Sequence, residues 1–278
     1  MSEDALRKAV REVQLNILIK LDEVCEKNGL RYYLAFGSCL GAVRHQGFIP
    51  WDDDIDVLMP YEDTRKLLTL QDQFGERLFV QSKETDPDYR SISMRIRDTG
   101  TTCIEGDEVG LKTKKGIYVD IYPYYECSDR SFTRLLDILR SNFLKVLVNH
   151  RPPENHGRLL ALASKAILLC YPEKRRFGKI EKLEKHLSAV RGSEILDYFG
   201  QDVSLFTAIS YPKEWFQEPK KLEFEGLHFN GPTEPEKYLT KRYGDYRKLP
   251  PAEDQVVHHT YVTIDPYKSY IEYEGSQS

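Results

Sequence analysis

The N-terminal stretch shows the clearest helical periodicity in the chain. Its apolar residues recur at spacings of three and four positions and are Leu6, Val10, Val13, Ile17, Leu21 and Val24. Such spacing places apolar side chains on one face of a helix. Ser2 precedes the stretch as a candidate N-cap, and Asn28-Gly29 follows it as a stop signal. We therefore predict a helix over residues 3–28 and assign it a structural role only.

Alternating apolar and polar residues predict two strands in the middle of the chain. The first strand, residues 91–98, has its apolar side chains on one face and carries on the other Ser91, Ser93, Arg95 and Arg97. The second strand, residues 116–122, has aliphatic side chains on one face and carries on the other Tyr118, Asp120 and Tyr122. Short apolar runs predict further strands at residues 33–36, 78–81 and 101–105.

Further helices and a hairpin follow from the same patterns. The helices are expected at residues 61–73, 129–150, 156–170, 173–189 and 235–243, and the hairpin at residues 221–229. Strands interspersed with helices predict an α/β fold, with a small mixed sheet, helices and a helical addition. We expect residues 1–125 to form the core, which also holds the candidate chemistry described next, and residues 126–278 to form a helical and C-terminal extension packed on that core.

Residues 33–60 hold the densest candidate chemistry. The apolar run Tyr33–Phe36 predicts a buried strand, Gly37 and Ser38 follow at a turn, and a short helix is expected over Cys39–Arg44. A strand, a Gly-Ser turn and a helix start together direct backbone N–H groups towards an anion. The sequence therefore predicts a phosphate-binding cradle at this turn.

Two aspartates after the cradle are the candidate metal ligands. Asp54 and Asp56 alternate with aliphatic residues, so a strand here projects both carboxylates to one face. Their Cα atoms then lie about 6–7 Å apart. Two charges about 4 Å apart repel by about 4 kcal/mol at an effective dielectric constant of about 20, and a cation between them removes this repulsion. Asp52 and Asp53 precede the pair, either as further ligands or as residues of the loop.

Two basic residues lie between the cradle and the carboxylates. Arg44 and His45 end the short helix, where a solvated helix C-terminus alone would explain either one. Their position between the two motifs favours a role facing a nucleotide phosphate. A phosphate cradle beside a carboxylate pair is typical of metal-assisted phosphoryl or nucleotidyl transfer.

The order of these motifs resembles a known signature. Gly37-Ser38 followed by Asp54-Ile55-Asp56 is similar to the signature of the nucleotidyltransferase-fold superfamily. The fuller string, GSCLGAVRH over residues 37–45 and GFIPWDDDID over residues 47–56, resembles the LicD family. That family contains choline phosphotransferases of bacterial surface polysaccharides and the fukutin-related proteins. The sequence YGDY, then LPP, over residues 243–251 resembles the closing motif of bacterial members.

The resemblance implies a nucleotidyltransferase-like core and adds site residues. The superfamily carries a third carboxylate on a later strand, which corresponds to Asp120. Asp54, Asp56 and Asp120 are then the expected catalytic residues and the ligands of Mg²⁺, with Mn²⁺ as a second option. A basic residue is common in the family near Arg95 and Arg97. The expected substrate-binding residues are Gly37, Ser38, Arg44, His45, Arg95 and Arg97.

A reaction is also implied by the resemblance. An acceptor hydroxyl attacks the β-phosphorus of a CDP-alcohol, a phospho-alcohol moves to a sugar of a surface polysaccharide, teichoic acid or lipopolysaccharide, and CMP leaves. CDP-choline is the favoured donor, and the acceptor is a glycan, free or lipid-linked. Aromatic residues expected near the site suit a choline ammonium group and are Trp51, Tyr118, Tyr122, Tyr124 and Tyr125.

Two alternatives stay open at this point. One is a nucleotidyltransferase that adds NMP to a small molecule and releases pyrophosphate. The other is a non-catalytic nucleotide-binding protein. Neither the alcohol, nor the acceptor sugar, nor the oligomeric state follows from the sequence.

Composition restricts the expected partners and the expected cellular compartment of this protein. A net charge of −4 and an isoelectric point near 6.0 argue against a nucleic-acid partner. The five cysteines are odd in number and form no CxxC pair, which favours free thiols in a reducing cytosol. The N-terminus shows no apolar signal region. We therefore expect a cytoplasmic protein without a transmembrane segment.

The apolar stretch Leu159–Cys170 is a candidate for contact with a membrane. The basic residues Lys174-Arg175-Arg176 and Lys179 after it could attract anionic lipid, although a solvated helix face is the default explanation for them. The apolar stretch is too short to span a bilayer, and we expect it to lie in the core. Shallow, peripheral contact with the inner face of the membrane is the less favoured alternative.

Overall fold

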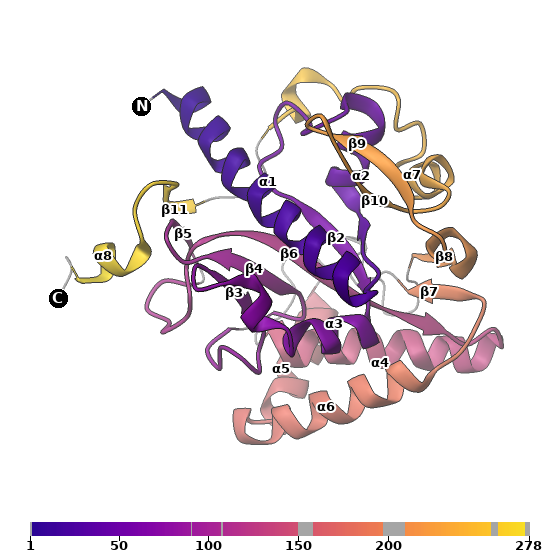
Figure 1. Cartoon of the computed structure of the whole chain (residues 1–278). Coiled ribbons are helices and arrows are strands. Elements are labelled where there is room, and N and C mark those ends of the chain that lie inside the picture. The colour runs from indigo at the N-terminus through magenta and orange to yellow at the C-terminus, as the bar shows by residue number, and fades with distance from the viewer. Residues whose placement is uncertain are drawn as a thin grey trace.

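The computed structural model describes residues 2–89, 91–106, 108–149, 158–196, 209–256 and 261–275 of the chain. A mixed sheet lies at its centre (Figure 1). Its strands run in the order β1 (Tyr33–Leu34), β2 (Asp56–Pro60), β6 (Ile117–Cys127), β4 (Met94–Asp98) and β3 (Leu78–Gln81). β2 and β6 are parallel, whereas the other neighbours in this row are antiparallel. The predicted α/β fold with a mixed sheet is confirmed.

Three shorter pairings extend the fold. β7 (Glu194–Leu196) pairs with the C-terminal end of β6 and with β8 (Ser210–Pro212). β9 (Lys220–Phe224) and β10 (Leu227–Gly231) form the predicted hairpin. β5 (Thr102–Glu105) pairs with β11 (Tyr261–Asp265), which brings the C-terminal part of the chain beside the middle of the sequence.

The apolar face of the sheet is covered by the N-terminal helix. Helix α1 (Glu3–Asn28) begins after Ser2, whose hydroxyl accepts a hydrogen bond from the N–H of Ala5, and ends at Gly29 in the left-handed conformation. Its residues Leu18 and Leu21 share the main core with aliphatic residues of β4 and β6, and Figure 1 shows the helix crossing the sheet. The alternation of the strands leaves Asp56, Asp120 and Arg95 on the opposite face, called here the polar face.

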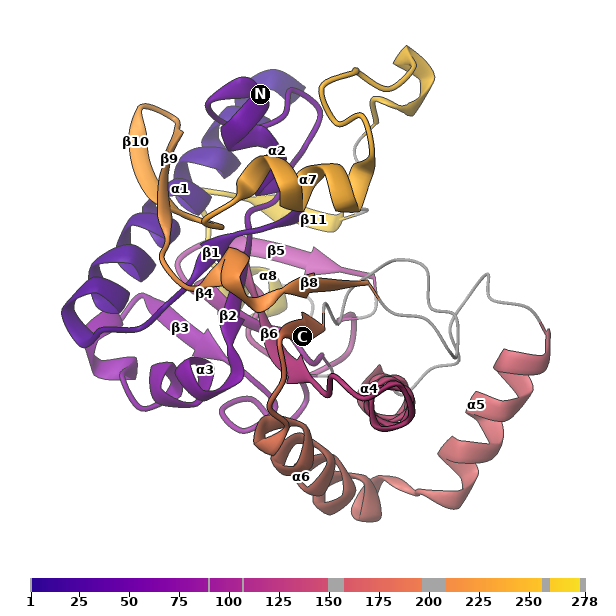
Figure 2. The same ribbon diagram turned by 90° about the vertical axis from the view of Figure 1, so that its right-hand side faces the viewer.

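The remaining helices surround this centre (Figures 1 and 2). They are α2 (Phe36–His45), α3 (Tyr61–Leu68), α4 (Ser131–Asn149), α5 (Arg158–Cys170), α6 (Glu173–Ala189), α7 (Pro235–Tyr243) and α8 (Tyr270–Gly275). α4 and α6 enclose a second apolar cluster with Tyr125 of β6. The hairpin β9–β10 and α7 add Phe224, Phe229 and Leu239 to the main core.

The C-terminal extension therefore completes the core. Strand β6 runs through the boundary predicted between residues 125 and 126, and the main core contains residues from both sides of it. The site described below accordingly draws on both parts of the chain.

The predicted helix 61–73 ends at Leu68, and the predicted strand 91–98 begins at Met94. Two further predictions, both at the predicted site, were wrong in detail. The expected strand Tyr33–Phe36 stops at Leu34, and helix α2 already begins at Phe36, so Gly37 and Ser38 lie within its first turn. The expected strand through Asp54 and Asp56 begins only at Asp56, which leaves Asp54 in the preceding loop. Both differences arise at the predicted site, where the helix begins earlier and the strand begins later than the sequence pattern predicts.

Candidate active site

The start of α2 has a strained backbone. Phe36 has a φ of 47°, a left-handed value that is unfavourable for a bulky residue. Its N–H donates a hydrogen bond to the hydroxyl of Tyr238 at 3.1 Å, and its ring packs edge-on against Tyr122 at 5.3 Å between ring centroids. The contacts that hold Phe36 come from α7 and β6, so the tertiary structure imposes the conformation of the helix start.

Gly37 and Ser38 connect this helix start to the acidic residues. A Cβ atom on Gly37 would lie 2.5 Å from Oδ2 of Asp52, so only glycine lets that carboxylate approach the helix N-terminus. The hydroxyl of Ser38 accepts a hydrogen bond of 2.8 Å from the N–H of Asp56. Ser38 is buried and fixes the first residue of β2. The two predicted cradle residues thus position carboxylates.

Two of the three predicted ligands, Asp56 and Asp120, are neighbours across the sheet. They are register partners on the parallel strands β2 and β6, and both are buried. Oδ1 of Asp56 has no hydrogen-bond partner within the described chain. Burial raises the pKa of Asp56 well above its usual range, and the charges of Asp54, Asp120 and Asp52 raise it further. An unsatisfied buried carboxylate among like charges is the arrangement that a bound cation stabilises.

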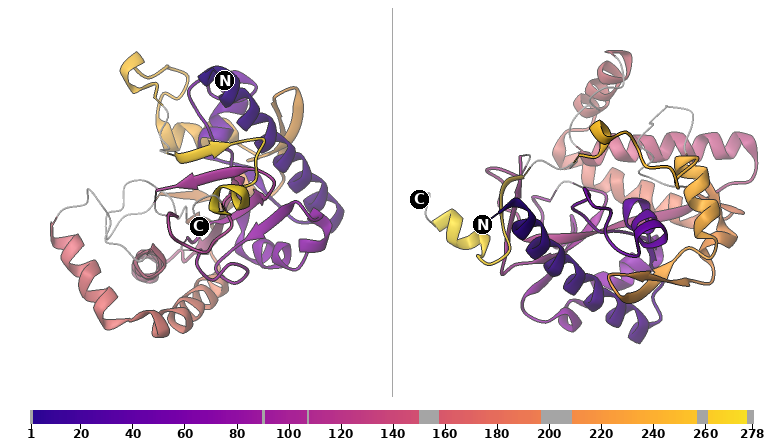
Figure 3. Two further views of the ribbon diagram at one scale, coloured as in Figure 1. Left: turned by 90° about the vertical axis from the view of Figure 1, so that its left-hand side faces the viewer. Right: turned by 90° about the horizontal axis from the view of Figure 1, so that it is seen from above.

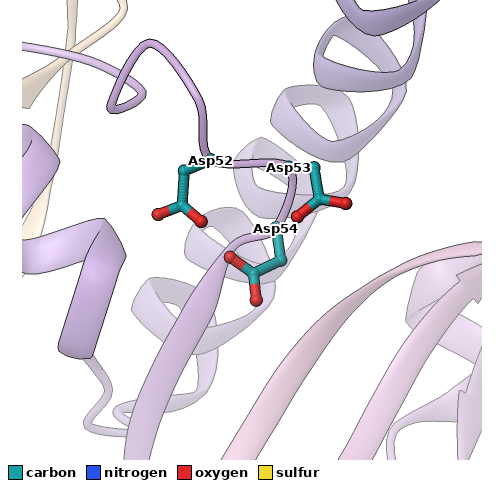
Figure 4. Close-up of side chains that lie close together, drawn as sticks. All are labelled: Asp52, Asp53 and Asp54. Atoms are coloured by element: carbon teal, nitrogen blue, oxygen red, sulfur yellow. The ribbon is translucent and has the colours of Figure 1, made fainter. Parts of the chain in front are cut away.

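The third predicted ligand, Asp54, lies in an acidic loop with Asp52 and Asp53 (Figure 4). One oxygen from each of these three carboxylates lies within 4.8 Å of the other two. Asp53 also lies close to Tyr261 of β11. Burial is the main cause that raises the pKa of the Tyr261 hydroxyl, and the charges of Cys103, Asp53 and Asp54 raise it further. The acidic group at the site is therefore larger than the predicted triad.

Asp120 is oriented by its neighbours on the polar face. Its Oδ1 accepts hydrogen bonds from Oγ of Ser93 at 3.2 Å and from Nε of Arg95 at 3.0 Å. Arg95 also pairs with Glu105 at 2.6 Å and lies 3.8 Å above the ring of Tyr118. The structure thus uses Arg95 to hold one oxygen of Asp120 in place.

Arg97, predicted to touch the substrate, lies in the interior. Its side chain is 0% exposed. It pairs with Glu108 and donates hydrogen bonds to Oε1 of Gln81 at 2.6 Å and to the carbonyl of Gly116 at 2.9 Å. This network connects β4 to the neighbouring strand β3 and to the segment before β6, so here Arg97 stabilises the fold.

Arg44 and His45 lie at the other end of α2. The helical rise places Arg44 about 10 Å along the axis from Gly37. Arg44 donates hydrogen bonds to Nε2 of His45 at 2.9 Å and to the carbonyl of Tyr246 at 2.8 Å. Burial and the nearby Arg44 lower the pKa of His45, which favours the neutral imidazole that accepts this bond. The structure brings this pair to the segment after α7.

Sequence reasoning assigned no role to Arg242. Its guanidinium carbon lies 4.2 Å from the centroid of the Phe36 ring, above the start of α2. Its positive charge acts on Asp56 against the upward pKa shift caused mainly by burial. The available signal was its position directly before the YGDY string, which resembles the closing motif of bacterial members of the LicD family.

Helix α1 also contributes to the site. One nitrogen of Arg11 donates hydrogen bonds to the carbonyls of Ile49 at 2.8 Å, Pro50 at 3.0 Å and Asp52 at 2.6 Å. Gln14 donates a bond of 2.8 Å to the carbonyl of Asp53. The helix predicted to be structural alone therefore holds the acidic loop in place.

We expect Arg11→Met to lower turnover by about tenfold to a hundredfold, because displacement of reacting groups by about 1 Å has effects of this size. Methionine keeps an apolar stem of similar length but has neither the guanidinium that lies on the Phe48 ring nor a donor for the loop. Arg7→Met is the matched control, since Arg7 donates a single bond of 3.3 Å to Pro50. Turnover at the wild-type rate in Arg11→Met would contradict the positioning role.

A helix start beside grouped carboxylates on adjacent strands is the arrangement of a nucleotidyltransferase-like site. Residues 29–143 of the chain match the family described as LicD/FKTN/FKRP, nucleotidyltransferase domain. The predicted resemblance is thereby confirmed.

Proteins of known and of unknown activity are similar in sequence to this chain. The chain is 29% identical to the lipopolysaccharide cholinephosphotransferase LicD of Haemophilus influenzae over 89% of this chain and 93% of that protein. It is 30% identical to the human ribitol 5-phosphate transferase FKRP over 37% of this chain and 18% of that protein. An uncharacterized protein of Rickettsia typhi, RT0683, is 44% identical over 44% of this chain and 31% of its own length.

Proposed function

We propose that this protein transfers a phospho-alcohol from a CDP-alcohol to a hydroxyl of a glycan and releases CMP. The observation that carries the proposal is the buried, unpartnered oxygen of Asp56 beside Asp120 and the acidic loop, at the start of α2. The similarity to a cholinephosphotransferase over most of both chains supports the same chemistry.

The residues at the site fit a divalent cation. Oxygen ligands are those that Mg²⁺ and Mn²⁺ prefer, and one oxygen of Asp56 has no hydrogen-bond partner among the residues that the structure describes. Asp54, Asp56 and Asp120 would hold the ion, with Asp52 within reach of Asp54. When bound, the ion neutralises charge on the transferring phosphate and orients it.

The chain's own groups would do the remaining work. Backbone N–H groups at the start of α2 face the anionic donor, and Arg242 adds a guanidinium suited to phosphate oxygens. Ser38 holds Asp56, and Arg95 with Ser93 holds Asp120. The acceptor hydroxyl gives its proton to a carboxylate of the acidic site as its oxygen bonds to the β-phosphorus. The bond from that phosphorus to CMP breaks.

The carried alcohol is best tested by a donor screen. We expect CMP release from CDP-choline to exceed release from CDP-glycerol and CDP-ribitol when the glycan acceptor is present. Preference for either polyol would exclude choline but leave the phosphotransferase mechanism in place. Release of pyrophosphate from CTP, with NMP found on the product, would instead establish the nucleotidyltransferase alternative, and no turnover with any nucleotide would favour a binding protein.

The aromatic residues favour choline less strongly than expected. Tyr124 packs against Phe216 and Tyr33 in the main core, and Tyr125 stacks on Tyr61. The face of Tyr118 is covered by Arg95. Of the five residues proposed from the sequence, Tyr122 and Trp51 remain as candidates to contact an ammonium group.

Arg242 offers a test of donor binding. We expect Arg242→Met to raise KM for the CDP-alcohol about tenfold to a hundredfold, since hydrogen bonds to charged groups contribute about 1.5–3 kcal/mol. Arg242→Lys should recover only part of the loss because lysine cannot bind two phosphate oxygens with a planar fork. The exposed Arg247, which lies on Tyr246, supplies the control Arg247→Met. Equal effects of the two methionine variants would argue against this role.

A further inference from the structure

Helix α5 has two different faces. Ile167 on one face, together with Tyr171 just after the helix, packs against the cluster formed by α4 and α6. The opposite face, called here the outer face of α5, consists of Leu162, Lys165, Ala166, Leu169 and Cys170, and all five are exposed. Their spacing of three and four positions aligns them along one side of the helix.

The outer face is apolar and unusually exposed. Leu162 and Leu169 are 63% and 83% exposed. Our expectation that this apolar stretch lies wholly in the core was therefore wrong for this face. Figures 2 and 3 show α5 at the periphery, away from the central sheet, on the side of α4 and α6.

Charge around this helix is strongly segregated. Residues 158–189, which span α5 and α6, contain eight lysines and arginines and three glutamates, a net charge of +5. The whole chain carries −4, so the remainder is acidic. α5 itself contains no acidic residue, and Lys165 and Arg175 form no ion pair within the described chain.

The start of α6 is joined to the end of α5 by hydrogen bonds. Arg176 donates hydrogen bonds to the carbonyls of Tyr171 at 2.6 Å and Leu168 at 3.3 Å, at the C-terminal end of α5. These bonds tie the beginning of α6 to α5. Phe177 and Arg175, both exposed, follow directly. Exposed apolar and basic side chains thus occur both on the outer face of α5 and at the start of α6.

We propose that the outer face of α5, with Arg175 and Phe177, docks on an anionic lipid surface. An apolar helix face flanked by lysine and arginine is what binds at the boundary between headgroups and acyl chains. No helix of the described chain is long and apolar enough to cross a bilayer. The proposed contact is one in which the helix lies along the lipid surface. A second copy of this chain fits less well, because two basic surfaces repel each other.

Docking would hold the enzyme at the surface where lipid-anchored glycans lie, but it does not depend on the reaction proposed above. Vesicle binding can therefore succeed or fail whether or not the protein releases CMP from any donor. The two proposals are tested separately.

Sedimentation with vesicles tests the surface. We expect the full chain to bind vesicles of phosphatidylcholine mixed with phosphatidylglycerol, to bind phosphatidylcholine alone weakly, and to lose affinity as salt is raised. Leu162→Glu combined with Leu169→Glu should lower binding about tenfold or more. The matched control is Leu249→Glu combined with Ile271→Glu, which makes the same charge change at sites 51% and 61% exposed elsewhere.

A label on Cys170 reports the contact directly. Cys170 is exposed, whereas Cys25, Cys39, Cys103 and Cys127 are buried, so an environment-sensitive thiol dye reacts at the outer face of α5. We expect its emission to shift to the blue on mixed vesicles and to be quenched by brominated lipid. An unchanged spectrum with no sedimentation would overturn the proposal. So would a dimer, seen by light scattering, that the Leu162→Glu and Leu169→Glu variant dissociates, because the face would then be a subunit interface.

Discussion

Replacing Asp56 by asparagine is expected to lower turnover at least about a hundredfold and to raise the melting temperature of the metal-free protein. Turnover falls because the cation loses a ligand whose charge it needs, a change of several kcal/mol in transition-state stabilisation. Stability rises because a buried carboxylate with an unsatisfied oxygen, close to the charges of Asp54, Asp120 and Asp52, becomes neutral. Each kcal/mol of relief corresponds to about 2–4 °C for a chain of this size.

Thermal unfolding with and without Mg²⁺ checks both halves of this result. Mg²⁺ should raise the melting temperature of the wild-type protein, because a ligand that binds only the folded state stabilises it. The gain should be absent in Asp56→Asn and reduced in Asp54→Asn, which also loses turnover. The metal-site assignment fails if either variant retains more than a few per cent of activity, or if Asp56→Asn responds to Mg²⁺ as the wild type does.

Asp120→Asn should abolish turnover to a similar extent, but with the opposite effect on stability. Asp120 shares a buried ion pair with Arg95, whose Nε lies 3.0 Å from its Oδ1. Removing one partner of a buried pair costs about 3–5 kcal/mol. Here the loss should be smaller, since Arg95 keeps its bond to Glu105. The two aspartates are thus expected to have equal roles in catalysis and different roles in the fold.

The free energies of unfolding of Asp56→Asn and Asp120→Asn, compared with the wild type, test this expectation. Urea unfolding of the metal-free proteins should place Asp56→Asn above the wild type and Asp120→Asn below it, with unchanged m-values. Ser93→Ala is a milder control, because it removes one of the two bonds to Oδ1 of Asp120 and leaves the charges in place. If Asp120→Asn were as stable as Asp56→Asn, the account of Arg95 as the residue that holds Asp120 would be wrong.

Local patterns were sufficient for the elements and for the face on which the key carboxylates lie. Helix α1 and strands β4 and β6 could be predicted because their periodicity spans several turns or several alternations. The placement of Asp120 among aliphatic neighbours predicted its position on the polar face, where Asp56 also lies. The boundary at Phe36 could not be predicted, because a contact with Tyr238, distant in sequence, accompanies its left-handed backbone. Nor could the loop at Asp54, whose neighbours Asp52 and Asp53 accept hydrogen bonds from helix α1.

By itself, the sequence determined the class of this protein, an α/β fold with a Gly-Ser turn, an acidic string and a third carboxylate in the order typical of the LicD family. Only the tertiary structure decided what each basic residue does. Arg95 and Arg97 share one face of one strand, yet one holds Asp120 and the other is buried against Glu108.

Long-range contacts decided the rest of the site. Arg242 reaches the start of α2 from a helix near the other end of the chain. The outer face of α5 is exposed although its sequence suits a core equally well. The physical reason is common to these cases: periodicity records which side of an element is apolar, whereas the partner of a side chain depends on which distant element packs against it.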